Sequence, residues 1–206
     1  MRIRDYACTD MPYLYEICLK TGDSGGDATA LYSDPYLIGQ YYAAPYAVHD
    51  PRSVLILEGG ANGDARPVGY ILGAVDTAAY HLWFDREWRP ALTALYREGP
   101  VKSEIEKSLR SLFTAPFELP AFHAEYPGHI HIDLLPEAQG AGWGRKLMDA
   151  FSERLQELGC PGFHLGVDRN NVGGMAFYRR YGMVELEALE WGWYFGKKLQ
   201  PPPGSA

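Results

Sequence analysis

The sequence predicts a mixed α/β fold in which helices flank a central, mostly antiparallel sheet. Two observations favour this fold class. The first 75 residues hold short strand patterns of the kind that pair antiparallel, and residues 128–182 alternate between strand and helix patterns. Because a strand–helix–strand passage joins parallel neighbours, we expect two parallel strands inside the sheet.

Length and composition indicate a single soluble domain over residues 1–199, followed by a flexible proline-rich tail over residues 200–206. No stretch approaches the ~20 apolar residues of a membrane span, and we expect no secretory signal. The formal net charge of −7 argues against nucleic acid and is compatible with a cationic ligand such as an amine. Three distant cysteines without metal-ligand spacing are expected to be reduced core thiols in a cytoplasmic protein.

The first part of the chain is expected to form three strands and two helices. The strand patterns cover residues 3–7, 53–58 and 67–75. The last two strands form an antiparallel pair with a turn at 59–64. Asp10 is expected to cap a helix that runs to about residue 20, and a second helix covers 36–42 and ends before Pro45. Tyrosines gather between residues 32 and 46, where they either pack in the core or line a ligand pocket.

Residues 76–128 form a long insertion that is rich in aromatic residues and prolines. Helical patterns lie around residues 88–96 and 101–113. A segment of this length is usually functional or disordered, and this composition is too aromatic for disorder. We therefore expect the insertion to cover the ligand side of the sheet.

The centre of the sequence combines a strand, a glycine-rich turn and a helix. Residues 130–135 alternate as a half-buried strand, which Pro136 ends. The turn that holds Gly140, Gly142 and Gly144 leads into a helix that stops at Gly159. The first N–H groups of a helix are unpaired and its dipole is positive there, so this arrangement predicts an anion site, unless it is only a tight turn. It fits neither the dinucleotide fingerprint nor a Walker loop.

The remaining elements complete the sheet. A strand pattern covers residues 163–167, and a helix over residues 173–181 is ended by Gly182. Strand patterns over residues 184–189 and 191–198 form a closing pair.

Two motifs indicate a family. The loop Gln-x-x-Gly-x-Gly, formed by Gln139, Gly142 and Gly144, resembles the pyrophosphate loop of the GCN5-related N-acetyltransferases (GNAT), which bind acetyl-CoA. A second similarity is the seven-residue interval from Asn171 to Tyr178, with Gly182-Met183 where the family has Gly-Phe and Gly174 where it usually has Ala. Because both motifs occur in the right order, the chain is identified as a member of that family.

The resemblance implies where acetyl-CoA binds. The cofactor would enter between two splayed parallel strands, residues 130–135 and 163–167. Unpaired N–H groups of Leu134 and Leu135 would polarise the thioester carbonyl, and Asn171 would contact the pantetheine arm. The remaining cofactor-binding residues implied are Gln139, Gly140, Ala141, Gly142, Trp143, Gly144, Arg145, Gly174, Phe177 and Tyr178.

The resemblance also assigns catalytic residues. Tyr178 stands where the family often has a general acid for the coenzyme A thiolate, and the motif favours this role over packing against the cofactor or in the core. The general base that relatives carry earlier on the cofactor strand is missing here. Asp133 is the preferred candidate, with His131 on the same strand face and Asp168 at the end of the facing strand. The alternatives are a purely structural Asp133 and a water chain to solvent.

The whole chain also resembles the acetyltransferase-like domain that follows the hydrolase in eukaryotic O-GlcNAcase, and its free-standing bacterial relatives. Two functions follow from these resemblances. One is an N-acetyltransferase that acts on a primary amine, and the other is an acetyl-CoA-binding module without turnover. A site for another acyl-CoA is a third reading. We expect a monomer or, because exposed aromatic residues are expected in the insertion, a homodimer.

Overall fold

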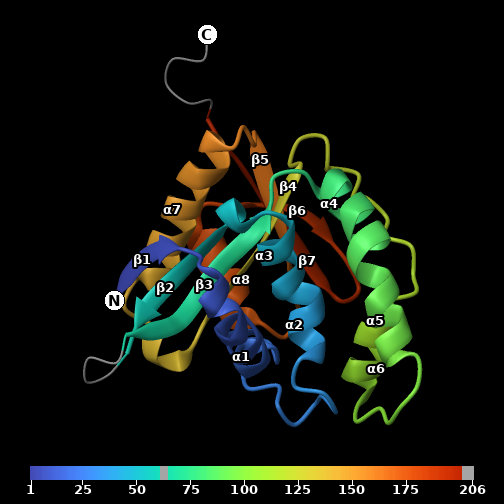
Figure 1. Cartoon of the computed structure of the whole chain (residues 1–206). Coiled ribbons are helices and arrows are strands. Elements are labelled where there is room, and N and C mark those ends of the chain that lie inside the picture. The colour runs from blue at the N-terminus through green and yellow to red at the C-terminus, as the bar shows by residue number, and fades with distance from the viewer. Residues whose placement is uncertain (61–64, 201–206) are drawn as a thin grey trace.

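The computed structural model describes residues 1–60 and 65–200, so most of the expected 59–64 turn and of the tail lies outside the described residues. Figure 1 shows a seven-stranded sheet in the order β1-β2-β3-β4-β5-β7-β6. The pair β4–β5 is parallel, whereas every other neighbouring pair is antiparallel. The predicted mixed fold class is therefore confirmed.

The N-terminal half of the sheet is antiparallel. Its strands are β1 (Arg2–Asp5), β2 (Val54–Gly59), β3 (Arg66–Ala74) and β4 (Gly128–Leu134). Strands β2 and β3 are almost continuously apolar and are buried along most of their length, which is typical of strands that are covered on both faces. A short 3₁₀ turn, Pro51–Ser53, leads into β2.

Three helices lie in front of this half of the sheet in Figure 1: α1 (Met11–Thr21), α2 (Leu37–Tyr42) and α3 (Ala44–His49). Asp10 is the N-cap residue of α1, as predicted, and ends a 3₁₀ turn, Cys8–Asp10. Its carboxylate forms no cap hydrogen bond, because it binds the Arg4 guanidinium and the Ala7 N–H instead. The predicted second helix corresponds to α2, which ends before Pro45, whereas α3 was not predicted. Proline is tolerated in the first turn of a helix because no intrahelical acceptor waits for its missing N–H.

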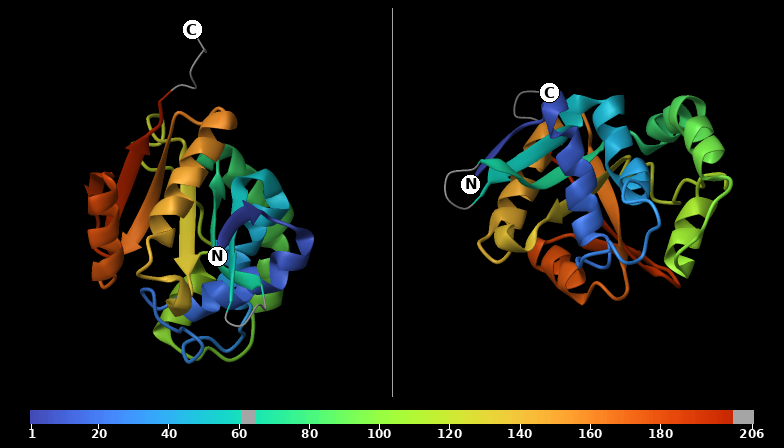
Figure 2. Two further views of the ribbon diagram at one scale, coloured as in Figure 1. Left: turned by 90° about the vertical axis from the view of Figure 1, so that its left-hand side faces the viewer. Right: turned by 60° about the horizontal axis from the view of Figure 1, so that its bottom comes forward.

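The insertion between β3 and β4 is largely helical. It forms α4 (Thr77–Trp83), a π-helical turn (Phe84–Trp88), α5 (Arg89–Tyr96) and α6 (Glu104–Ser111). The two helices that the sequence predicts are present, and α4 was missed. Figure 2 shows these helices grouped at one side of the molecule, beside α2. The large exposed apolar residues on them are aliphatic rather than aromatic, as at Leu82 and Leu95.

The C-terminal half carries α7 (Trp143–Glu157), β5 (Gly162–Asp168), α8 (Val172–Tyr181), β6 (Val184–Ala188) and β7 (Gly192–Lys198). Helices α7 and α8 lie behind the sheet in Figure 1. Gly159 and Gly182 have φ angles of +80° and +88° at the ends of these helices, as their sequence positions predict. Among the described residues, no helix is both long and apolar enough to cross a membrane.

Candidate active site

Strands β4 and β5 separate soon after they meet. Their parallel pairing includes only Gly128 with Phe163 and His129 with His164. The following residues of β4 pair with β3 but not with β5, so one edge of β4 faces a gap between the two strands. The predicted splay is present, and it places the carboxyl end of β4 beside the glycine loop.

The register of β4 decides which N–H groups face this gap. The Leu135 N–H donates to the Val68 carbonyl oxygen at 2.9 Å. Antiparallel pairs alternate between bonded and non-bonded positions, so the Leu134 N–H points away from β3. The expectation of two unpaired N–H groups is therefore wrong for Leu135, and Leu134 keeps the expected geometry. The same alternation directs the Ile132 N–H into the gap, which the sequence reasoning missed.

Gln139 connects the glycine loop to β4. Its side-chain amide donates to the Leu134 carbonyl oxygen at 2.8 Å, and its own N–H donates to the Pro136 carbonyl oxygen at 3.1 Å. A short 3₁₀ turn, Pro136–Ala138, lies between β4 and the loop. The Gln139 N–H is consequently used within the turn, and this residue fixes the loop rather than offering its main chain to an anion.

The glycine loop has the geometry of an anion site. Gly140 and Gly142 have φ angles of +78° and +79°, and a Cβ atom at either position would meet open space. The first main-chain bond of α7 runs from the Lys146 N–H to the Gly142 carbonyl oxygen. The N–H groups of the preceding residues have no acceptor among the described residues: Gly140, Ala141, Gly142, Trp143, Gly144 and Arg145.

The cations beside this loop fit a pyrophosphate. Arg145 and Lys146 lie in the first turn of α7, where positive charge opposes the helix dipole. Both are exposed; the Arg145 guanidinium lies 5.6 Å from the Tyr181 ring centre, and the Lys146 ammonium lies 4.1 Å from the Trp143 ring centre. A bound pyrophosphate would relieve the unfavourable placement of both charges.

Asn171 begins α8 as its N-cap. Its side-chain oxygen accepts a hydrogen bond of 2.8 Å from the Gly174 N–H. A Cβ atom at position 174 would lie 2.8 Å from that oxygen, so the cap explains why glycine replaces the usual alanine. The Asn171 side-chain nitrogen forms no hydrogen bond in this cap. Phe177, one turn further along α8, packs near Gly144 of the glycine loop.

Asp133 lies half-buried at the end of β4. The buried Tyr70 hydroxyl on β3 donates to Asp133 Oδ2 at 2.6 Å. Burial raises the pKa of the Asp133 carboxyl, although the hydrogen bond from Tyr70 opposes that rise. The Thr21 hydroxyl donates to the Ile17 carbonyl oxygen at 2.8 Å, so among the described residues Tyr70 is the donor to Asp133, and Oδ1 is left for a ligand. Tyr70 belongs to no motif. The alternation of side chains along β3 could have predicted that its ring lies on the same face of the sheet as Asp133.

The thiols differ in their surroundings. Cys18 on α1 is buried, and burial, with the nearby Asp133 charge, raises the pKa of its thiol. Cys160 is also buried, whereas Cys8 is exposed, so the expectation of three core thiols is wrong for Cys8.

Tyr178 belongs to the same site. It lies on the half-buried side of α8, with its ring 5.8 Å from the Phe195 ring. Burial, together with the negative charge of Asp133, raises the pKa of the Tyr178 phenol, so it stays protonated at neutral pH. Asp168, in contrast, is exposed and accepts a hydrogen bond of 2.8 Å from the Asn170 N–H in the turn after β5.

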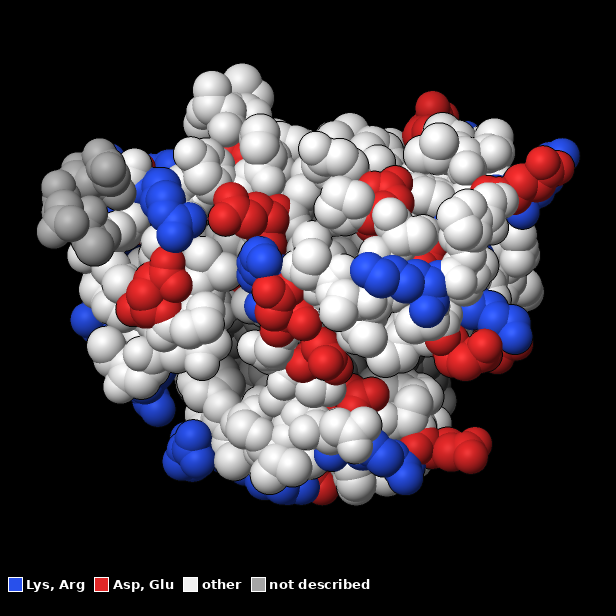
Figure 3. All heavy atoms as spheres, turned by 90° about the horizontal axis from the view of Figure 1, so that it is seen from below, with Lys and Arg blue, Asp and Glu red and all other residues white. Residues whose placement is uncertain are grey.

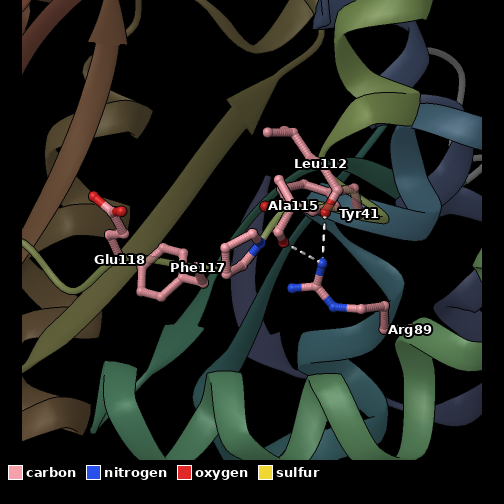
Figure 4. A pocket seen from close by; sticks show the side chains of 7 residues that line it. Tyr41, Arg89, Leu112, Ala115, Phe117 and Glu118 are labelled. Atoms are coloured by element: carbon pink, nitrogen blue, oxygen red, sulfur yellow. Dashed lines mark hydrogen bonds between the residues drawn. The ribbon is translucent and has the colours of Figure 1, made fainter.

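The tyrosines of α2 and α3 pack in the core, and one of them borders a cavity. Tyr46 is buried, and Tyr42 packs its ring 5.4 Å from the His131 ring. Tyr41 lines a cavity of about 240 Å³ between α2 and the insertion, beside Arg89 and Glu118 (Figure 4). The remaining lining residues are Leu112, Ala115, Pro116 and Phe117. Figure 3 shows that the molecule is hollowed when seen from below, with acidic groups beside the hollow.

Comparisons with known proteins agree with this geometry. Residues 26–183 match the sequence model of the Acetyltransferase (GNAT) family. The chain is 32% identical to a protein named SsHAT of known crystal structure, with a TM-score of 0.82 over 96% of this chain and 97% of that one.

More distant structures share the fold. A ribosomal-protein-alanine N-acetyltransferase from Brucella melitensis is 16% identical, with a TM-score of 0.56 over 97% of this chain and 100% of that one. The yncA protein of Salmonella typhimurium, solved with acetyl-CoA, is 14% identical, with a TM-score of 0.55 over 100% of this chain and 97% of that one. With its family motifs, fold and splayed strands in agreement, the chain belongs to the GNAT family of acetyltransferases.

Proposed function

We propose that this protein transfers an acetyl group from acetyl-CoA to a primary amine. Acetyl-CoA is the donor that GNAT acetyltransferases use. The proposal rests on the position of Asp133 at the end of β4, where this strand leaves β5, and on the charge of Asp133, which contributes to the raised pKa of Tyr178. A carboxylate and a protonated phenol at one end of a cofactor gap are the groups that amine acetylation needs.

The main chain holds and polarises the donor. Free N–H groups from Gly140 to Arg145 bind the pyrophosphate, and the Leu134 N–H donates to the thioester carbonyl oxygen. Asn171 faces the pantetheine arm with its side-chain nitrogen. These contacts hold the carbonyl carbon near the acceptor nitrogen, which lowers the entropic part of the barrier.

The side chains move the protons. Asp133 receives the amine as an ammonium and removes a proton through its free oxygen, while Tyr70 fixes the other oxygen. Tyr178 donates its phenolic proton to the leaving sulfur. Because burial keeps the phenol protonated, Tyr178 holds this proton until the sulfur gains negative charge.

The acceptor is proposed to be cationic and to lie on the insertion side. The cavity beside Tyr41 offers the Tyr41 and Phe117 rings, which suit an ammonium group, and the Arg89 guanidinium that also lines it is paired with Asp85 at 2.7 Å. The net charge of −7 adds a favourable long-range field.

An acetylation assay over a panel of primary amines tests the proposal. Wild-type protein should consume acetyl-CoA with at least one amine, and Asp133→Asn and Tyr178→Phe should each lower kcat by roughly 100-fold. Tyr181→Phe is the matched control, because the Tyr181 hydroxyl donates to Asp149 at 2.9 Å and points away from the proposed reaction. Unchanged turnover in both test variants would remove these catalytic roles.

The second candidate function is a module that binds acetyl-CoA without turnover. The resemblance to the acetyltransferase-like domain of O-GlcNAcase favours this alternative. Calorimetry separates the two functions: a wild-type protein that binds acetyl-CoA but acetylates no amine of the panel is the module.

A further inference from the structure

A chain of hydrogen bonds runs behind the site, from the main chain of the insertion to β4. Thr77 Oγ1 lies 2.7 Å from the Pro127 carbonyl oxygen and 2.9 Å from His129 Nδ1. The Tyr46 hydroxyl oxygen lies 2.9 Å from His129 Nε2 and 3.0 Å from His131 Nε2. Four side chains from α3, α4 and β4 are thereby linked in one row.

The direction of every bond in this row follows from its first member. A carbonyl oxygen only accepts, so the Thr77 hydroxyl donates to Pro127 and must accept from His129 Nδ1–H. A neutral His129 then accepts at Nε2 from Tyr46, whose only proton is used there. The Tyr46 oxygen must in turn accept from His131 Nε2–H, which leaves His131 Nδ1 without a proton.

Both histidines are neutral at neutral pH. Burial, and then the neighbouring histidines, lower the pKa of His129 well below its usual range. Burial lowers the pKa of His131 to about 4, and His164 adds to that shift. The titratable groups near His131 come from four elements: Tyr42 on α2, Tyr46 on α3, His129 and Asp133 on β4, and His164 on β5.

The His131 side chain lies on the strand face that carries Asp133. His131 is two residues before Asp133 on β4, so both side chains occupy the same face of the strand. His131 is half-buried, and no described residue forms a hydrogen bond with its Nδ1. The row therefore presents a fixed proton acceptor next to the carboxylate proposed as general base.

Acetylation of an ammonium group requires two proton acceptors. The nitrogen loses one proton before it can attack and a second when it becomes an amide. On the proposed function, Asp133 removes the first. We propose that His131 accepts the second proton at Nδ1 as the nitrogen–carbon bond forms, and that Tyr46 is the positioning residue that holds His131 in the required tautomer.

The step balances in protons and electrons. The nitrogen lone pair forms the bond to the acetyl carbon, and the carbon–sulfur bond pair leaves with the sulfur. Asp133 and His131 take two protons from the nitrogen, and Tyr178 gives one to the sulfur. One of the two accepted protons restores Tyr178 through solvent and the other is released. An imidazole of low basicity suffices for His131, because bonding to the acetyl carbon makes the remaining nitrogen proton far more acidic.

Nitrogen-15 NMR of the imidazole rings tests the tautomer without any substrate. In the wild type at neutral pH, His131 should show a protonated Nε2 and a bare Nδ1. Tyr46→Phe keeps the ring that stacks on Tyr80 and removes the bridging hydroxyl, so His131 should become a mixture of tautomers. A wild-type His131 that is charged, or protonated at Nδ1, would overturn the proposal.

Kinetics test the proton transfer. His131→Gln can still donate to Tyr46 but lacks a basic nitrogen, so kcat should fall roughly 100-fold with acetyl-CoA affinity unchanged. Tyr80→Phe is the matched control, because its buried hydroxyl has no hydrogen-bond partner among the described residues. If His131→Gln keeps wild-type kcat while Asp133→Asn does not, this inference fails and the proposed function stands. Absence of wild-type turnover overturns both.

Discussion

The two ends of the site are built from different groups. The proposed pyrophosphate end consists of main-chain N–H groups whose directions follow from two glycines with positive φ and the start of α7. The proposed acceptor end consists of side chains from several elements, in which Tyr46 and Tyr70 meet β4 across 83 and 63 residues of sequence. A site made of main chain depends on local backbone shape, whereas a site made of side chains depends on distant packing.

Helices α5 and α6 of the insertion also hold the segment that precedes the proposed acceptor end. Glu106 of α6 is fully buried and accepts hydrogen bonds from the Ser33 N–H at 2.9 Å and the Ser33 hydroxyl at 2.6 Å. Arg110 pairs with the same carboxylate at 2.6 Å. Tyr96 of α5 donates to Asp34 at 2.7 Å. The insertion thereby anchors the segment that leads into α2 and its tyrosines.

The largest effect should come from Gly142→Glu. The glutamate places bulk and negative charge at the pyrophosphate, so acetyl-CoA affinity measured by calorimetry should fall at least ~100-fold, or about 3 kcal/mol. Gly159→Glu is the matched control: Gly159 has a φ angle of +80° at the other end of α7, with open space around it. Both variants should lose a similar ~1–2 kcal/mol of stability, and equal loss of binding would contradict the site assignment.

Glu106→Ala should lower the stability of the fold and leave cofactor binding intact. Removing one member of a buried, hydrogen-bonded ion pair should cost about 3 kcal/mol of unfolding free energy in chemical denaturation, with acetyl-CoA affinity nearly unchanged. Glu104→Ala on the same helix is the control, because the Glu104 side chain is 88% exposed. If the contacts of Glu106 with Ser33 and Arg110 support only the proposed acceptor end, KM for the amine should rise in the Glu106 variant and stay constant in the Glu104 variant.

The pH dependence of stability should reflect the same carboxylate. Burial acts to raise the pKa of Glu106, but hydrogen bonds led by Ser33 outweigh it and the net shift is downward from 4.5. A carboxyl with a lowered folded-state pKa contributes stability above its unfolded pKa and loses it as pH falls through the folded value. Wild-type protein should therefore lose this contribution below about pH 4.5, and Glu106→Ala should lose less on acidification.

Asp133→Asn should have a smaller effect, of opposite sign, on stability. The folded-state pKa of Asp133 is raised, so its contribution to stability is present below its unfolded pKa of 3.8 and is lost as pH rises through the folded value. The asparagine does not titrate and still accepts from Tyr70, so the variant should melt at a higher temperature than wild type near neutral pH. This advantage should vanish toward pH 3.8 in thermal melts. A lower melting temperature at neutral pH would contradict the predicted shift.

The smallest effect should come from Tyr80→Phe. Its hydroxyl is buried without a partner among the described residues, so removing it should stabilise the fold by at most about 1 kcal/mol. Thermal unfolding should show a slightly raised midpoint. A destabilised variant would show that the hydroxyl has a partner in solution, such as a water molecule.

Features of this protein that depend on neighbouring residues could be predicted from the sequence. Strand alternation placed β4 and β5, and glycines at positions 142, 159 and 182 marked the ends of α7 and α8. Two short motifs then identified the family and predicted the anion site. These features were readable because each depends on residues within one turn or one strand.

Contacts between groups that are far apart in the sequence became known from the tertiary structure alone. The register between β3 and β4 paired the Leu135 N–H and left that of Leu134 free. The approach of Arg4 took the Asp10 carboxylate away from the cap, and α3 brought Tyr46 between two histidines. Contacts between segments this far apart depend on how whole elements pack, and no local pattern of residues records that packing.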